Sequence, residues 1–156
     1  MNTWFTADIH FGHKNICKFT KRPFGSVGEM DEKFVENWNE VVRHDDKVFV
    51  LGDYSFRESH ETEVLTSRLR GNKFLVRGNH DYTSRLPSFG FQWMRHYAEI
   101  KVGEDHIVMS HFPMMSWHKI HRGAYMLHGH CHGQLRLPQE FQNARIFDVG
   151  VDSVVT

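Results

Sequence analysis

The first half of the chain alternates short apolar runs with helical hydrophobic patterns. Apolar runs at 3–8, 47–51 and 73–77 predict strands, and the second of them is continuous enough to be buried on both faces. Between these runs, residues 26–43 and 58–69 have the spacing of amphipathic helices. Strands that alternate with helices in this way predict a parallel sheet with crossover helices.

The first of the two predicted helices has a defined start and one apolar face. Ser26 and Glu29 have the spacing of a capping box, in which each side chain binds backbone at the helix start. Met30, Phe34 and Trp38 then recur at steps of four residues. We therefore expect one face of this helix to pack on the core.

The second half of the chain has a different pattern. Residues 97–102 and 106–109, joined by Gly103-Glu104-Asp105, predict a β-hairpin, and 125–127 and 145–149 predict further strands. This half is expected to be a mainly antiparallel block. No repeat, linker or low-complexity segment separates it from the first half, so residues 1–156 are interpreted as a single domain.

Composition narrows the class of protein. No run of eighteen apolar residues occurs, and the first residues lack the pattern of a secretory signal, so a cytoplasmic protein without membrane contact is expected. Two cysteines do not imply a disulfide framework. The 19 basic and 19 acidic residues cancel, which argues against a surface that grips long nucleic acid and leaves small or local phosphate substrates open.

Histidine is the residue type that points to chemistry. The chain has 13 histidines, and imidazole is the commonest metal ligand as well as a common acid or base near neutral pH. Most of them are expected to be ordinary surface residues. The informative ones come directly after predicted strands.

Residue types that commonly bind metals follow each predicted strand of the first half and two regions of the second half. Because ligands bind beyond the carboxyl ends of strands in open α/β sheets, these clusters are expected to converge. Paired dications need carboxylates to offset charge, neutral imidazoles, and an oxygen donor shared between them. The clusters are Asp8-Ile9-His10, Gly52-Asp53, Gly78-Asn79-His80-Asp81, Ser110-His111 and Gly129-His130-Cys131-His132.

The clusters differ in specificity. Residues 8–10 or 52–53 alone are better explained as strand-end turns, whereas a four-residue pattern such as 78–81 recurs by chance roughly once in 10^5 positions. Residues 129–132 are intermediate, because a zinc knuckle or a histidine-rich turn has the same appearance. All five clusters in order, each after a strand, favour a metal site.

On these clusters the sequence resembles the calcineurin-like metallophosphoesterase superfamily, and more narrowly its small single-domain bacterial or phage-type members. The ordered signature D-x-H, G-D, G-N-H-D/E, H and G-H-x-H is complete between residues 8 and 132. Arg22-Pro23-Phe24 and Val149-Gly150-Val151-Asp152 fit the narrower group. The resemblance implies an α/β (α+β) fold, a four-layer αββα sandwich of two facing mixed β-sheets flanked by helices.

The resemblance also implies roles for the site residues. One metal would be held by Asp8, His10, Asp53 and His132, and the other by Asp53, Asn79, His111 and His130, so that Asp53 bridges them. His80 would contact the phosphate and protonate the leaving group, and Asp81 would orient its imidazole. The cofactors would be two divalent metal ions, with Mn²⁺ favoured and Fe, Zn, Ni or Co as alternatives.

The expected activity is hydrolysis of a phosphate ester by a water or hydroxide that bridges two metals roughly 3.5–4 Å apart. A phosphodiesterase is favoured, with a nucleotide or a nucleic-acid end among the candidate substrates. A phosphomonoesterase or phosphoprotein phosphatase is the alternative, and a non-catalytic metal-binding scaffold is a third interpretation. The sequence does not indicate the oligomeric state.

Two further segments carry weaker signals. His13 either contacts substrate or braces its loop, and the two interpretations stay open. Trp117, His118 and His121 lie between two ligand clusters, where loops often carry selectivity, with hydrophobic packing of Trp117 as the alternative.

Overall fold

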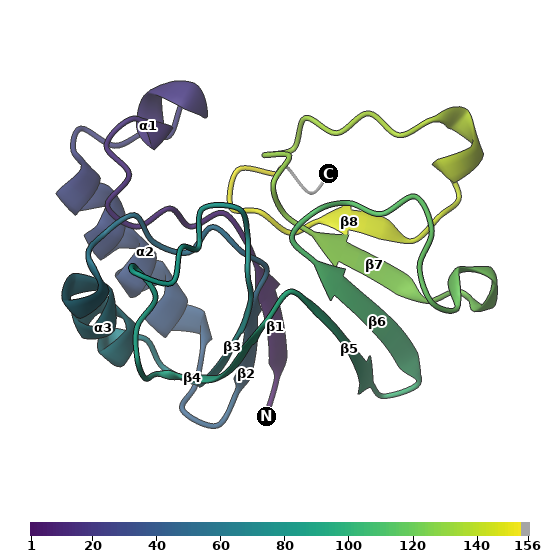
Figure 1. The fold of residues 1–156 in the computed structure, drawn as a ribbon, viewed down its shortest axis with the longest axis horizontal. Coiled ribbons are helices and arrows are strands. Elements are labelled where there is room, and N and C mark those ends of the chain that lie inside the picture. Colours follow the sequence, from purple (N-terminus) through teal and green to yellow (C-terminus); the bar gives the residue numbers. More distant parts are fainter. Residues whose placement is uncertain (154–156) are drawn as a thin grey trace.

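The computed structural model describes residues 1–153 and folds into two four-stranded sheets that face each other (Figure 1). The single-domain interpretation therefore extends three residues beyond the described range. The first half contains β1 (Thr3–Thr6), α1 (Ile16–Phe19), α2 (Val27–Val41), β2 (Lys47–Val50), α3 (Ser59–Arg68), β3 (Asn72–Val76) and β4 (Phe91–Arg95). The second contains β5 (Tyr97–Val102), β6 (Asp105–Ser110), η1 (Ile120–Arg122), β7 (Tyr125–His128), η2 (Gln139–Phe141) and β8 (Ile146–Asp148).

The first sheet has the order β1-β2-β3-β4, and all its pairs are parallel. This agrees with the parallel sheet predicted for the first half. Strand β4, at the edge, was not predicted from the sequence, because Phe91–Arg95 mixes aromatic, amide and basic residues without an apolar run. Helix α1 was also missed, and at four residues it is too short to show periodicity.

The second sheet has the order β5-β6-β7-β8 and corrects one expectation. The β5–β6 hairpin forms as predicted, but β6 pairs with β7 in parallel and β7 with β8 in parallel. The block is therefore not mainly antiparallel. The physical reason is the length of the connections. Segments 111–124 and 129–145 are long enough to carry the chain back to the end of the sheet where the preceding strand began, so that the next strand runs in the same direction.

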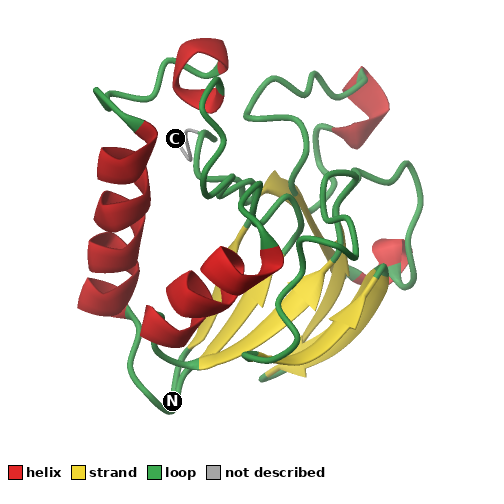
Figure 2. Cartoon of the chain, turned by 60° about the vertical axis from the view of Figure 1, so that its left-hand side comes forward, coloured by secondary structure: helices red, strands yellow, loops and turns green. Residues whose placement is uncertain are grey.

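The expected two-sheet sandwich is confirmed, with α-helices on one side. Figure 2 shows α2 and α3 on the outer face of the first sheet. The outer face of the second sheet is covered by the segments 111–124 and 129–145, which contribute only the short helices η1 and η2. None of the described helices is long and apolar enough to cross a membrane.

Three apolar clusters hold these layers together. The central one joins the two sheets, the second packs α2 and α3 on the first sheet, and the third lies under the covering segments of the second sheet. The central cluster contains Ala7, Phe49, Leu51, Val76, Ala98, Ile107, Met109 and Leu127. An isolated parallel bridge between Ala7 and Gly150 adds a backbone link between the sheets beside the strand ends.

The local signals of α2 are reproduced. Ser26 is the N-cap, and its hydroxyl oxygen accepts a hydrogen bond from the Glu29 backbone at 3.1 Å. The Glu29 carboxylate accepts from the Gly25 backbone rather than from Ser26, so the reciprocal contact is displaced by one residue. Met30 is fully buried, and Phe34 and Trp38 pack on the second apolar cluster.

Candidate metal centre

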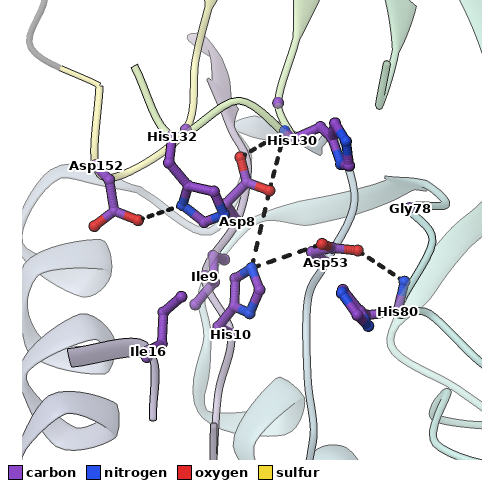
Figure 3. Close-up of polar contacts among 12 residues, drawn as sticks. Asp8, Ile9, His10, Ile16, Asp53, Gly78, His80, His130, His132 and Asp152 are labelled. Carbon is purple, nitrogen blue, oxygen red and sulfur yellow. Dashed lines mark hydrogen bonds and ion pairs between the residues drawn. The ribbon is translucent and has the colours of Figure 1, made fainter. Parts of the chain in front are cut away.

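The loops that follow β1, β2, β3, β6 and β7 meet at one end of the two sheets, and Figure 3 shows several of their side chains pointing toward one another. Two groups of potential ligand atoms form there, each with its atoms within 4.8 Å of one another. One group is Asp8, His10 and His132, and the other is Asp53, His111 and His130. Segments far apart in the sequence thus supply both groups.

Asp53, a member of the second group, also lies close to the first. Its Oδ2 atom is 3.6 Å from His10 Nε2 and 3.5 Å from His111 Nε2. Asn79 joins the second group, because its Oδ1 atom is 3.0 Å from His111 Nε2 and 3.1 Å from His130 Nδ1. The arrangement is that of two adjacent sites that share one carboxylate.

The backbone of these loops is held in an unusual conformation. The φ angles of Asp8, His10, Asp53, His130 and His132 are 56°, 57°, 52°, 69° and 47°. Non-glycine residues adopt this left-handed region rarely, at a cost of about 1–3 kcal/mol each, and such residues cluster at functional sites. The fold therefore maintains a strained backbone at the candidate ligands.

The burial of Asp8 and His10 favours a bound cation. Burial raises the pKa of the Asp8 carboxyl to about 7, since little water remains to solvate its negative charge. Burial lowers the pKa of His10 to about 2, which keeps its imidazole neutral and able to donate a lone pair. The Nε2 atom of His10 is buried without a hydrogen-bond partner. A buried carboxylate beside an unpartnered imidazole nitrogen is the environment that a metal ion would complete.

Two glycines allow the ligands to approach closely. Gly52 has a φ of 88°, and a Cβ atom there would collide with the His111 imidazole. A Cβ atom at Gly129 would lie 2.7 Å from Oδ2 of Asp8. Any side chain at either position would displace a candidate ligand.

His80 and Asp81 both hydrogen-bond to Asp53. The backbone N–H of His80 donates to Asp53 Oδ1 at 2.9 Å. The Asp81 carboxylate is buried and accepts hydrogen bonds from the backbone of Asp53, Tyr54 and Gly78, at 2.9, 2.9 and 2.7 Å. These hydrogen bonds join the loops after β2 and β3 through Asp81. The expected role of Asp81 in orienting the His80 imidazole stays a prediction, since a carboxylate can accept more than three hydrogen bonds.

Two of the candidate histidine ligands are oriented by a hydrogen bond at Nδ1. His132 Nδ1 lies 2.7 Å from Asp152 Oδ2, and His111 Nδ1 lies 2.8 Å from the carbonyl oxygen of Leu51. In each ring Nδ1 is occupied by this hydrogen bond, so Nε2 is the nitrogen that can bind a metal ion. Hydrogen bonds of this kind fix the tautomer and rotation of metal-binding histidines.

Asp152 belongs to a buried network that sequence reasoning did not assign to the site. The Arg22 guanidinium donates to both Asp152 oxygens, at 2.8 and 2.7 Å, and to the carbonyl oxygens of Ile9 and Asp8. Although burial raises the pKa of Asp152, the hydrogen bonds from Arg22 and His132 outweigh it and lower the pKa. A signal existed, since Asp152 follows the predicted strand 145–149 just as the other candidates follow theirs.

His13 braces its loop through another histidine. Its Nδ1 atom is 3.1 Å from His10 Nδ1, and its ring stacks on Phe56 with a centroid distance of 4.1 Å. These contacts favour the bracing interpretation of His13 over direct contact with substrate. Trp117 is buried in the third apolar cluster, which agrees with the packing interpretation of that residue.

Comparisons with known proteins agree with this geometry. Residues 1–141 match the calcineurin-like phosphoesterase family. An uncharacterised protein of Methanocaldococcus jannaschii is 33% identical over 131 residues, which cover 83% of this chain and 68% of that protein. The gene 66 protein of Mycobacterium phage L5 is 30% identical over 183 residues, covering 97% of this chain and 87% of the phage protein.

A solved structure has the same fold. A protein of unknown function from Aquifex aeolicus superimposes with a TM-score of 0.74 at 20% identity, covering 97% of this chain and 91% of that one. The family match includes all five ligand clusters of the sequence. The chain belongs to the calcineurin-like phosphoesterase family and is a metal-dependent hydrolase of phosphoric esters.

Proposed function

We propose that the protein is a dinuclear phosphodiesterase whose two divalent cations are held by the side chains gathered at the strand ends. Asp53 is assigned to both cations. The first site consists of Asp8, His10, Asp53 and His132, and the second of Asp53, Asn79, His111 and His130.

The position of Asp53 carries this proposal. Its Oδ2 atom is within 3.6 Å of an imidazole nitrogen from each group, so one oxygen can serve both sites. The donor set of carboxylate, amide and imidazole fits Mn²⁺, which we favour, as well as Fe, Zn, Ni and Co. When bound, the two cations would supply an activated water nucleophile and neutralise charge on the phosphate oxygens.

His80 is assigned to the proton that the leaving group requires. Its backbone is fixed to Asp53 Oδ1, and its ring lies 5.0 Å from the Phe56 ring and 6.2 Å from the His10 ring, measured between centroids. The half-buried imidazole thus stands beside both sites and is accessible to a substrate. A general acid at this position would protonate an alkoxide as the ester bond breaks.

The commitment of Arg22 is one argument for a diester over a monoester. The phosphate of a monoester dianion carries one more negative charge than that of a diester, and an arginine commonly neutralises such a charge. The guanidinium of Arg22, beside His132, is committed to Asp152 and to two backbone carbonyls, so it does not face the substrate. Asn79 and His130 are exposed, which leaves room at the rim for the second ester group, such as that of a nucleotide or a nucleic-acid end.

Hydrolysis of bis-p-nitrophenyl phosphate and of p-nitrophenyl phosphate with Mn²⁺ tests the proposal. We expect faster release of nitrophenol from the diester and no release with a chelator. Preference for the monoester would favour the phosphatase alternative, and inactivity on both esters with every metal would favour the scaffold alternative.

His80→Ala tests the assigned acid. We expect this variant to bind Mn²⁺ as the wild type does while turnover of an alkyl phosphodiester falls about 10²–10⁴-fold, the usual contribution of a positioned acid. A nitrophenolate leaving group needs little protonation, so turnover of a nitrophenyl diester should fall much less. His60→Ala is the matched control, because the His60 side chain is 89% exposed. Equal losses on both esters would overturn the role of His80.

A further inference from the structure

A third cluster of metal-ligand side chains lies away from the centre described above. Glu99 on β5, His106 on β6 and His118 on the segment after β6 have ligand atoms within 4.8 Å of one another. Glu99 Oε2 is 2.7 Å from His106 Nε2 and 2.8 Å from His118 Nδ1. One carboxylate oxygen therefore lies between two imidazole nitrogens.

The β5–β6 hairpin carries this cluster part-way along the second sheet, with Glu99 opposite Val108 and His106 near the turn. Strand β6 separates His106 from His111 by five residues, or about 17 Å at the rise of a strand. In Figure 1 the turn between β5 and β6 points away from the loops that follow β1, β2 and β3. The two clusters cannot share an ion.

The geometry is close to that of a zinc site. Zinc takes imidazole nitrogens and carboxylate oxygens at about 2.0–2.2 Å in a tetrahedron, which sets neighbouring ligand atoms roughly 3.3–3.5 Å apart. The contacts of Glu99 with His106 and His118 would have to lengthen by about 0.5–0.8 Å, which side-chain rotation can supply. Because the His118 side chain is 56% exposed, a water molecule can reach the fourth position.

Neighbouring groups prepare the carboxylate. The Tyr97 hydroxyl donates to Glu99 Oε1 at 2.5 Å, leaving Oε2 for the two histidines. Lys119 Nζ lies 3.4 Å from His106 Nδ1 and would have to turn toward solvent when His106 Nε2 binds an ion.

We propose that Glu99, His106 and His118 form a separate zinc site that fastens the covering segment 111–124 to the β5–β6 hairpin. On the outer face of the second sheet this segment takes part of the place of an α-helix, and Trp117 anchors it by packing, while its indole N–H donates to the Ala124 carbonyl oxygen at 3.0 Å. An ion at His118 would add a second anchor next to Trp117. The site thus has a structural role and does not touch the reacting ester.

Zinc content measures the site directly. Protein stripped with chelator, incubated with Zn²⁺ and desalted should retain one more zinc ion per chain than Glu99→Gln or His118→Gln treated in the same way. His121→Gln is the matched control, since this exposed histidine lies on the same segment outside the cluster and should leave the zinc content unchanged. Tyr97→Phe, which removes only a hydrogen bond to Glu99, should retain the ion with about 10-fold weaker affinity.

Two additional measurements separate this site from the phosphoesterase centre. The variant Asp53→Asn, altered in the phosphoesterase centre, should still retain the zinc ion that His118→Gln loses. Zinc should slow proteolytic cleavage within residues 112–119 of the wild type and leave cleavage of His118→Gln unchanged. Equal zinc content in wild type, Glu99→Gln and His118→Gln would overturn the proposal while leaving the phosphoesterase assignment intact.

Discussion

Asparagine in place of Asp152 would test how the buried network supports the metal centre. Asp152 accepts hydrogen bonds from two donors, the Arg22 guanidinium and the Nδ1–H of His132. The amide of asparagine offers one oxygen acceptor and one NH₂ donor. Because asparagine is neutral, Arg22 would lose its charge partner in either orientation of the amide. One of the two donors would also face the NH₂ group, and where that donor is His132 Nδ1–H the ring would lose its fixed orientation.

The size of the effect has two parts. Loss of a hydrogen bond to a metal-binding histidine typically weakens metal affinity 10–100-fold, or about 1.4–2.7 kcal/mol. Breaking a buried ion pair destabilises a protein by about 3–5 kcal/mol. The side chains of Arg22 and Asp152 are only 4% and 8% exposed, but Arg22 keeps the carbonyl oxygens of Ile9 and Asp8 as acceptors. We therefore expect the free energy of unfolding to fall by an amount near the lower end of the range of about 3–5 kcal/mol.

Calorimetric titration with Mn²⁺ measures the first part, and urea unfolding in the presence of chelator measures the second. Asp105→Asn is the control, because the Asp105 side chain is 58% exposed and contacts Arg145 only at 4.0 Å. If Asp152→Asn lost stability but bound Mn²⁺ with wild-type affinity, orientation of His132 by Asp152 would be refuted. Unchanged stability would refute the argument that Arg22 depends on this carboxylate.

Three further predictions concern the backbone, the core and pH. Gly52→Ala should weaken Mn²⁺ binding and turnover by at least 10-fold in the assays above, because φ at this position is 88° and a Cβ atom has no space; wild-type affinity would contradict this. Leu75→Ala, at a fully buried position, should lower the free energy of unfolding by about 2–5 kcal/mol in urea, and a loss below 1 kcal/mol would show that the core refills the cavity. Hydrogen bonds from the backbone of Asn2 and Arg43 lower the pKa of Asp46 from 3.8 to about 2, so its contribution to stability is complete above pH 4 and is lost as pH falls through 2. Thermal melting of wild type and Asp46→Asn between pH 2 and 5 should converge at the acid end, and parallel curves would refute the assignment.

The sequence was most informative where a local pattern determines position. The strands that precede Asp8, Asp53 and Asn79 are parallel neighbours, so their carboxyl ends must lie at one edge whatever the packing details. That rule brings the candidate ligands together without knowledge of side-chain rotamers. Apolar periodicity likewise placed α2, whose observed range of Val27–Val41 lies within two residues of the predicted one.

Contacts that depend on three-dimensional detail were beyond the sequence. The hydrogen bonds from the backbone of the loop after β2 to the Asp81 carboxylate follow from no sequence pattern, because only the structure brings that loop within reach. The direction of β7 followed from the path of a long connection rather than from any residue pattern. The cluster at Glu99 depends on the antiparallel register of β5 with β6 and on a turn of the chain twelve residues later.

The candidate ligands are divided between the sheets, with Asp8, Asp53 and Asn79 on loops of the first and His111 and His130 on loops of the second. Catalytic competence therefore depends on the spacing of the two halves, as it would for an active site at a subunit interface. A small change in sheet separation would alter every distance between the ligands of the first sheet and those of the second at once. Substitutions that disturb the packing of the central apolar layer should therefore lower turnover, even where they lie far from the reacting phosphate.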